Sequence, residues 1–338
     1  MSVLNSSLGQ FVLSLALLAG LAPLVVWFFR DTWAELDAEA LAHRQRLQGR
    51  ADRRTPVTLL LAAFCLILIN YFGSLEFFDE TLVPWLRRYE GEHPESLKLW
   101  LYEDLYWRVY WGFTRYLGYL LPLAVWPVIF RENPLDLGLR VRGLLEHAWI
   151  YLLFLVIVIP VLAMAAHMAD FGTYYPMYHL ASRSWLDLGV WEALYVFQFF
   201  ALEVFFRGFW LRGARALGSN AIFFMVCPYV MIHFPKPYLE ACGALVAGVV
   251  LGSLSMKTRS IWAGFLVHAT VAVLMDFLAL DRRNALPTRL TPFSSVRLAF
   301  PHTSTVLVFV WFLAAAGLAV ALWRRHRRGS APPSVPGP

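Results

Sequence analysis

The chain has 338 residues, of which 59% are hydrophobic and only 15% are charged. Soluble globular proteins carry roughly 25% charged residues, so this composition excludes a water-soluble enzyme of two domains. Disordered, collagen-like and disulfide-rich secreted proteins are excluded as well, since the three cysteines all lie in apolar stretches. The net charge of +6 comes from basic residues between apolar segments, which gives no indication of a nucleic-acid partner. We therefore predict an all-α, polytopic membrane protein that is embedded in the lipid bilayer.

Apolar segments of about 20 residues, the length of one helical membrane crossing, recur along the chain. Nine of them are predicted to be transmembrane helices: 8–29, 57–78, 111–130, 148–168, 190–211, 220–235, 240–256, 260–280 and 303–323. The first segment carries no charge and lacks the basic start of a signal peptide, so we expect it to be retained. Most arginines and lysines fall on the side that would be cytoplasmic if the N-terminus is outside. This distribution predicts an N-out, C-in protein, which we place in a bacterial inner membrane.

The chain divides into four predicted regions. An N-terminal transmembrane region of about four spans covers 1–189 and includes a charged cytoplasmic helix over 32–54. A core over 190–280 holds most of the ionisable residues found within spans. An outer loop and the last span cover 281–328, and the tail over 329–338 is rich in proline and polar residues, which predicts disorder.

Glu203 and Arg207 stand out because a charged side chain at the centre of a bilayer costs about 2.5–3.5 kcal/mol. They are four residues apart in the fifth predicted span, so a helix places them on one face, where they can form an ion pair. Such a pair satisfies both groups without any chemistry, and a purely structural role stays open.

Four further ionisable residues lie in or beside the later spans. His233 ends the sixth span, and His268 lies inside the eighth, with Asp276 two turns beyond it. Glu240 follows at the outer end of the sixth span. An interhelical hydrogen bond would explain either histidine alone, and an ion pair with Lys236 would explain Glu240.

The seventh span carries Ala244, Gly248 and Gly252 at intervals of four residues. A row of small residues lets two membrane helices approach closely. We therefore expect another helix to pack tightly on this face.

Familiar nucleophile and zinc motifs are absent from the sequence, which has no HExxH, no GxSxG and no CxxC. What remains is one glutamate and two histidines on three spans: Glu203, His233 and His268. A carboxylate and a histidine can activate water, and a second histidine can donate to an oxyanion. Counting along the spans lets the three meet in a polar cavity in the cytoplasmic half of the membrane, with Asp276 as an outer neighbour of His233.

Three short motifs resemble those of the CPBP family of intramembrane proteases, the relatives of the CAAX prenyl endopeptidase of the Ras-converting type. The family patterns EExxxR, FxxxH and HxxxN correspond here to LEVFFR (202–207), YVMIH (229–233) and HATVA (268–272). The resemblance covers roughly 190–280, about a quarter of the chain. It marks this core as protease-like.

Two positions depart from the family pattern. Leu202 stands where the family has its first glutamate, which is usually assigned to water activation, and Ala272 stands where it has asparagine. Glu203 matches the second glutamate, whose family role is more structural and acts through the arginine, here Arg207.

The resemblance implies a metal-independent endopeptidase that cleaves a membrane-associated protein or peptide, lipidated or not. In this interpretation Glu203 and His233 activate water, His268 binds the oxyanion, and Arg207 holds Glu203. Glu240 or Asp276 is the alternative base.

Three other interpretations stay open. Glutamate and histidine side chains also bind zinc, although no cofactor is expected. Leu202 and Ala272 favour a catalytically inactive membrane scaffold or immunity protein. A secondary transporter would show inverted repeats, and none is evident.

Overall fold

The computed structural model describes residues 6–141, 148–168 and 170–298, together with four isolated positions between 314 and 321. Every named element in this part of the chain is helical, which confirms the predicted all-α class. The predicted ninth span over 303–323 falls almost wholly outside the described residues, and the predicted disordered tail over 329–338 lies outside them.

Eight longer helices form the frame of the molecule. They are α1 (Ser7–Arg46), α2 (Arg54–Phe72), α5 (Leu99–Phe130), α6 (Ala148–Ala165), α8 (Trp185–Glu203), α10 (Asn220–Met231), α11 (Tyr238–Thr258) and α12 (Trp262–Arg282). Short helical segments join them: α3 (Leu75–Phe77), η1 (Phe78–Leu82), α4 (Val83–Glu92), η2 (Pro134–Leu137), α7 (Phe171–Tyr174), η4 (His179–Arg183), η5 (Val204–Trp210), α9 (Leu211–Gly213) and η6 (Arg215–Leu217).

Six described helices are long and apolar enough to cross a membrane: α1, α2, α5, α8 with its continuation through η5 and α9, α11 and α12. Helices α6 and α10 are apolar but shorter, so the predicted count of nine spans is not confirmed. The charged segment over 32–54 was expected to be helical. It continues α1 without a break as far as Arg46, because good helix formers follow the apolar part directly.

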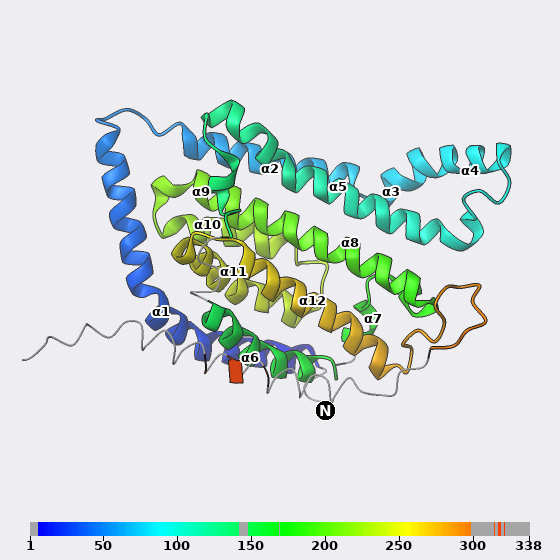
Figure 1. Ribbon diagram of the computed structural model, residues 1–338. Coiled ribbons are helices and arrows are strands. Elements are labelled where there is room, and N and C mark those ends of the chain that lie inside the picture. Colours follow the sequence, from blue (N-terminus) through cyan, green and yellow to red (C-terminus); the bar gives the residue numbers. More distant parts are fainter. Residues whose placement is uncertain are drawn as a thin grey trace, which may run out of the picture.

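The helices lie in three layers (Figure 1). Helices α8, α10, α11 and α12 form the middle layer, in which α10 packs on α11 and α8 packs on α12. Helices α2 and α5 pack on each other along one side of it, and α5 also contacts α8. On the opposite side, α1 contacts α11 and α6 contacts α12. The core predicted over 190–280 is therefore sheltered between two outer layers.

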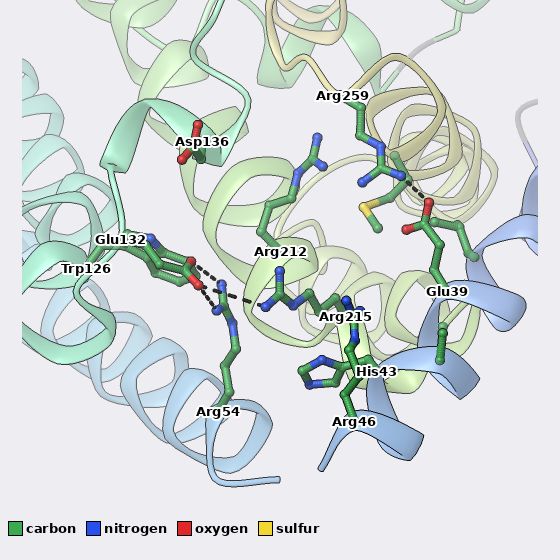
Figure 2. A pocket seen from close by; sticks show the side chains of 14 residues that line it. Glu39, His43, Arg46, Arg54, Trp126, Glu132, Asp136, Arg212, Arg215 and Arg259 are labelled. Atoms are coloured by element: carbon green, nitrogen blue, oxygen red, sulfur yellow. Dashed lines mark hydrogen bonds and ion pairs between the residues drawn. The ribbon is translucent and has the colours of Figure 1, made fainter.

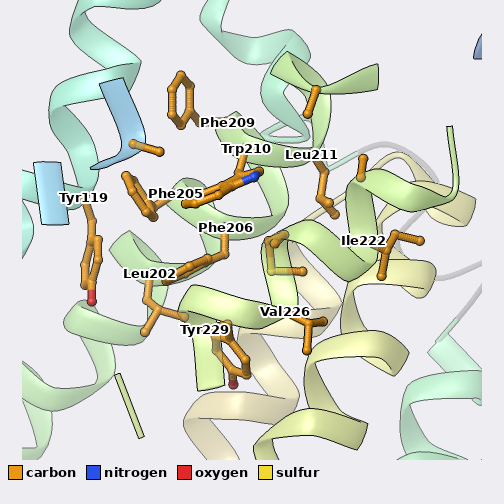
Figure 3. Packing of buried hydrophobic residues seen from close by; sticks show 14 of the residues in the cluster. Tyr119, Leu202, Phe205, Phe206, Phe209, Trp210, Leu211, Ile222, Val226 and Tyr229 are labelled. Carbon is orange, nitrogen blue, oxygen red and sulfur yellow. The ribbon is translucent and has the colours of Figure 1, made fainter. Parts of the chain in front are cut away.

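The largest buried cluster surrounds η5 (Figure 3). The aromatic residues of this segment are all buried: Phe205, Phe206, Phe209 and Trp210. Tyr119 of α5 packs against the first two of these rings, at centroid distances of 5.2 and 6.1 Å. Because lipid is as apolar as these side chains, their contribution in a membrane comes from close packing more than from removal of water.

The row of small residues on α11 packs against α10, as expected. A Cβ atom added at Gly248 would lie 3.0 Å from Val226 of α10, and one at Gly252 would lie 3.1 Å from Ile222. These glycines let the two helices approach closely enough to hold α10 beside the end of α8.

Candidate functional site

Glu203 is the last residue of α8, and the chain continues directly into the π-helical segment η5. Helix α8 starts after Ser184, whose hydroxyl accepts a hydrogen bond from the backbone N–H of Asp187. Segments of π-helix are uncommon and occur frequently at functional sites. The sequence prediction had assumed an unbroken α-helix here, so the local geometry between Glu203 and Arg207 differs from the expected one.

The expected ion pair between Glu203 and Arg207 forms nevertheless. Nη1 of Arg207 lies 3.2 Å from Oε1 of Glu203, and both side chains have 0% exposure. The guanidinium also lies 4.2 Å from the centre of the Tyr229 ring on α10, a cation–π contact. The pair therefore links the end of α8 to α10.

His268 of α12 reaches the same carboxylate. Its Nδ1 lies 3.1 Å from Oε1 of Glu203. Gly264, one turn earlier on α12, makes this approach possible, because a Cβ atom there would lie 2.9 Å from Oε2 of Glu203. The structure thus brings together residues 65 positions apart in the sequence. It joins the first and third motifs through one carboxylate oxygen.

The pairing of these groups is incomplete. Oε2 of Glu203 and all three guanidinium nitrogens of Arg207 are buried without a hydrogen-bond partner among the described residues. A buried polar atom left unpaired costs about 1–3 kcal/mol, and more when it is charged. A site that keeps buried polar atoms without hydrogen-bond partners has more hydrogen-bonding capacity than its packing uses.

His233 also packs against the Tyr229 ring. Its Nδ1 is 2.7 Å from the carbonyl oxygen of Tyr229, and the two rings are 4.8 Å apart between centroids. The same tyrosine ring lies 6.3 Å from the ring of His268. Tyr229 thus has a ring contact with both imidazoles.

Both histidines line a groove of about 1050 Å³. Its walls come from α8, α10 and α12, as the sequence predicted, but also from α1, α6 and α11. The additional walls are mainly Leu, Val, Ile and Phe side chains, so the expectation of a mostly polar cavity is wrong. The reason is that α1 and α6, which the motif analysis left out, cover the site from the side. Glu203 is not among the lining residues and reaches the groove through His268.

The two alternative bases are engaged by other side chains. Oδ2 of Asp276 accepts a hydrogen bond of 2.6 Å from the indole nitrogen of Trp191, and its side chain does not line the groove. The structure thus gives Asp276 a hydrogen-bond partner on α8 that the sequence did not predict. Glu240 lines the groove but is occupied by Lys236, at 2.7 Å, and by the hydroxyl of Tyr175.

No group of three histidine, cysteine, aspartate or glutamate side chains within the described ranges is placed to hold a metal ion. Glu203 and His268 contact each other, while His233 is turned toward the carbonyl of Tyr229. As they stand, these residues do not form the closed ligand set that a structural zinc site needs.

Three residues of this region were missed as site residues. Tyr229 occupies the aromatic position of the second motif, so the sequence did contain a signal for it. Gly264 carried none, because only the fold shows that its missing side chain makes room for Glu203. Glu192 was visible as a charge within an apolar stretch, and both its carboxylate oxygens are buried without a described partner.

The two departures from the family pattern have different surroundings. Leu202 is 3% exposed and packs in the apolar cluster around η5 (Figure 3). Ala272 lines the groove one turn beyond His268. Only the second position is open to the space in which a substrate would lie.

Comparison with known families agrees with the three motifs. Residues 183–274 match the family described as type II CAAX prenyl endopeptidase Rce1-like. This range contains Glu203, Arg207, His233, His268 and every other residue of the three motifs. The resemblance seen in the sequence is thereby confirmed for this Rce1-like region, which lies in an integral membrane protein. No curated protein and no solved structure matches the chain.

Proposed function

We propose that this chain is an intramembrane endopeptidase that hydrolyses a peptide bond of a membrane-associated protein or peptide. The observation that carries the proposal is the contact between His268 and Glu203, which joins the first and third motifs of the Rce1-like region beside a groove that His233 also lines. Two imidazoles beside one accessible space, one of them held by a carboxylate, can supply the base and the oxyanion donor that hydrolysis by water uses.

The hydrogen bonds of the two histidines give them different roles. A carbonyl oxygen only accepts, so Nδ1 of His233 carries the proton that it donates to Tyr229. Nε2 of a neutral His233 then has a free lone pair and acts as the general base. In the proposed mechanism Nδ1 of His268 donates to the Glu203 carboxylate, and the ring carries a proton on both nitrogens. Nε2–H of that ring is the donor for an oxyanion.

In the reaction, Nε2 of His233 takes a proton from water while the water oxygen attacks the scissile carbonyl carbon. The negative charge that develops on the carbonyl oxygen is stabilised by Nε2–H of His268. The C–N bond then breaks, and the protonated His233 returns its proton to the leaving amine. Glu203 touches neither water nor substrate in this scheme and acts as a positioning residue for His268. Arg207 holds the carboxylate in turn.

The groove suits a substrate with an apolar part. Its walls on α1, α6 and α11 are mainly aliphatic and aromatic, while the imidazoles lie on the walls formed by α10 and α12. A transmembrane segment or a lipid chain would fit along the apolar walls and hold a nearby peptide bond at His233 and His268. We place the protein in a bacterial inner membrane, N-out and C-in, with the site in its cytoplasmic half.

The test is turnover of a library of membrane-anchored peptides, with and without a prenyl group, by the purified full chain in lipid nanodiscs. Products are read by mass spectrometry with and without a chelator. Cleavage at a defined bond that persists with chelator supports the mechanism above. Cleavage lost with chelator and restored by zinc would replace it with a metal-dependent one, and no cleavage of any peptide contradicts the proposed function.

A second candidate function is a non-catalytic scaffold or immunity protein that binds a membrane partner. The observation that favours it is the position of Glu203, whose carboxylate is buried and does not line the groove, together with the apolar Leu202. In that case the peptides would bind without being cleaved, and substitution of either histidine would leave their affinity unchanged.

A further inference from the structure

A second pocket, of about 600 Å³, lies where α1, α5 and α11 end and α2 begins (Figure 2). Segments α9 and η6, which follow the π-helical η5, complete its wall. Five arginines line this pocket, but only three carboxylates do. It is separate from the groove, because the two share no lining residue.

Two of the five arginines are neutralised within the pocket. Arg54 donates to both oxygens of Glu132, at 2.6 and 2.8 Å, which is a bidentate ion pair. Arg259 forms an ion pair with Glu39 on the opposite side. Figure 2 shows these two pairs facing each other across the pocket.

The third carboxylate, Asp136, does not neutralise the charge of the remaining arginines. Asp136 is bound at 2.8 Å by Arg140, which does not line the pocket. Arg215 approaches only Glu132, at 3.9 Å, and that carboxylate already binds Arg54.

Arg46 and Arg212 form no ion pair with any described residue and leave the pocket with uncompensated positive charge. Arg212 extends into the middle of the pocket (Figure 2). Its Nε is buried without a described hydrogen-bond partner, and its Nη2 makes a single long contact of 3.4 Å with the carbonyl oxygen of Ser255. Basic residues at the ends of helices also stabilise the helix dipole, which accounts for an exposed residue such as Arg46. It does not account for a buried guanidinium nitrogen left without an acceptor.

We infer that this pocket binds a phosphate-bearing anion, with Arg46, Arg212 and Arg215 as its ligands. Guanidinium groups match phosphate oxygens in charge and geometry, and the volume exceeds what one phosphate needs. An anionic phospholipid headgroup is the favoured source, because basic pockets at the cytoplasmic ends of membrane helices bind such headgroups. Leu36 and Met256 add an apolar side to the pocket. A free phosphate would use the same ligands.

The inference stands apart from the proposed proteolysis, because none of these arginines lines the groove. Its test is native mass spectrometry of the full chain in detergent, titrated with phosphatidylglycerol, with phosphatidylcholine, and with phosphatidylglycerol in the presence of inorganic phosphate. We expect one saturable phosphatidylglycerol site that phosphatidylcholine does not fill. If millimolar phosphate displaces the lipid and by itself raises the melting temperature, the site takes the free anion as well.

Two substitutions of equal charge change make the test specific. Arg46→Gln removes an exposed ligand and should weaken the binding of phosphatidylglycerol roughly fivefold, the effect of one basic residue near a membrane surface. Arg44→Gln, two residues earlier on α1 and outside the pocket, should leave it unchanged. Arg212→Gln should weaken binding further, but Arg46→Gln decides the test if the Arg212 variant does not fold. Equal binding of both lipids without any effect of phosphate, or equal loss in the Arg44 and Arg46 variants, would overturn the inference.

Discussion

Nδ1 of His268 lies 3.1 Å from Oε1 of Glu203, so a single hydrogen bond joins the middle of α12 to the end of α8. Arg207 approaches the same oxygen at 3.2 Å. The Glu203 carboxylate therefore interacts with both Arg207 and His268, and both interactions depend on its negative charge. Substitutions at this point should separate a structural role of the carboxylate from a role in positioning His268.

Glu203→Gln keeps the shape of the side chain but removes its charge. It leaves Arg207 as a buried unpaired cation, which should destabilise the protein by about 3–5 kcal/mol. The double variant Glu203→Gln with Arg207→Gln should recover most of the melting temperature, because no charge is then stranded. Turnover should stay at least tenfold below wild type in both, since His268 loses the carboxylate that positions it. A double variant that regains full turnover would remove Glu203 from the mechanism.

Gly264→Ala tests how closely α12 must approach Glu203. The new methyl group would lie 2.9 Å from Oε2, so either the carboxylate or the helix has to shift. We expect a loss of about 1–3 kcal/mol in stability and a fall in kcat of roughly tenfold or more. Gly189→Ala on α8 is the matched control, because a Cβ atom at that helical position meets nothing within 4 Å and the residue does not line the groove. That substitution should leave activity unchanged and stabilise the helix slightly.

Ala272→Asn restores the residue of the family pattern at a position that lines the groove. If the site is a protease, the added amide gives the oxyanion a second donor beside His268 and should raise kcat several-fold. Ala272→Val adds similar bulk without a donor and serves as the control. A gain with valine equal to that with asparagine would show that the effect comes from packing.

The sequence predicted the membrane class, the Glu203–Arg207 pair and a closely packed helix on the small-residue row of α11, because hydropathy and residue spacing report local structure directly. It did not predict the π-helical turn after Glu203, since no residue pattern distinguishes such a turn from an α-helix. The room that Gly264 makes for Glu203 depends on the packing of α12 against α8, two helices that are distant in the sequence. The apolar walls of the groove were missed for a similar reason. Helices α1 and α6 lie outside the three motifs, and only the fold brings them to the site.

The arginine pocket gives a prediction for the pH dependence of stability. The Arg54 guanidinium, which donates to both oxygens of Glu132, holds the pKa of that carboxyl below its usual value. The stabilisation is therefore fully present above the unfolded pKa of about 4.3 and is lost as the pH falls through the lower folded pKa. In neutral detergent, Arg54→Gln should melt below wild type at pH 7, and the difference should shrink below about pH 4. A difference that stays constant across this range would show that the ion pair does not contribute.

The most direct test of the central claim is the turnover of His233→Ala and His268→Ala on the best peptide of the library, compared with wild type and with His93→Ala. His93 is exposed at the end of α4 and lies outside the groove, so its substitution should leave turnover unchanged. Loss of a general base or an oxyanion donor should reduce kcat by roughly 10²–10⁴-fold in each of the other two variants. Wild-type turnover by folded His233→Ala or His268→Ala protein would contradict the account.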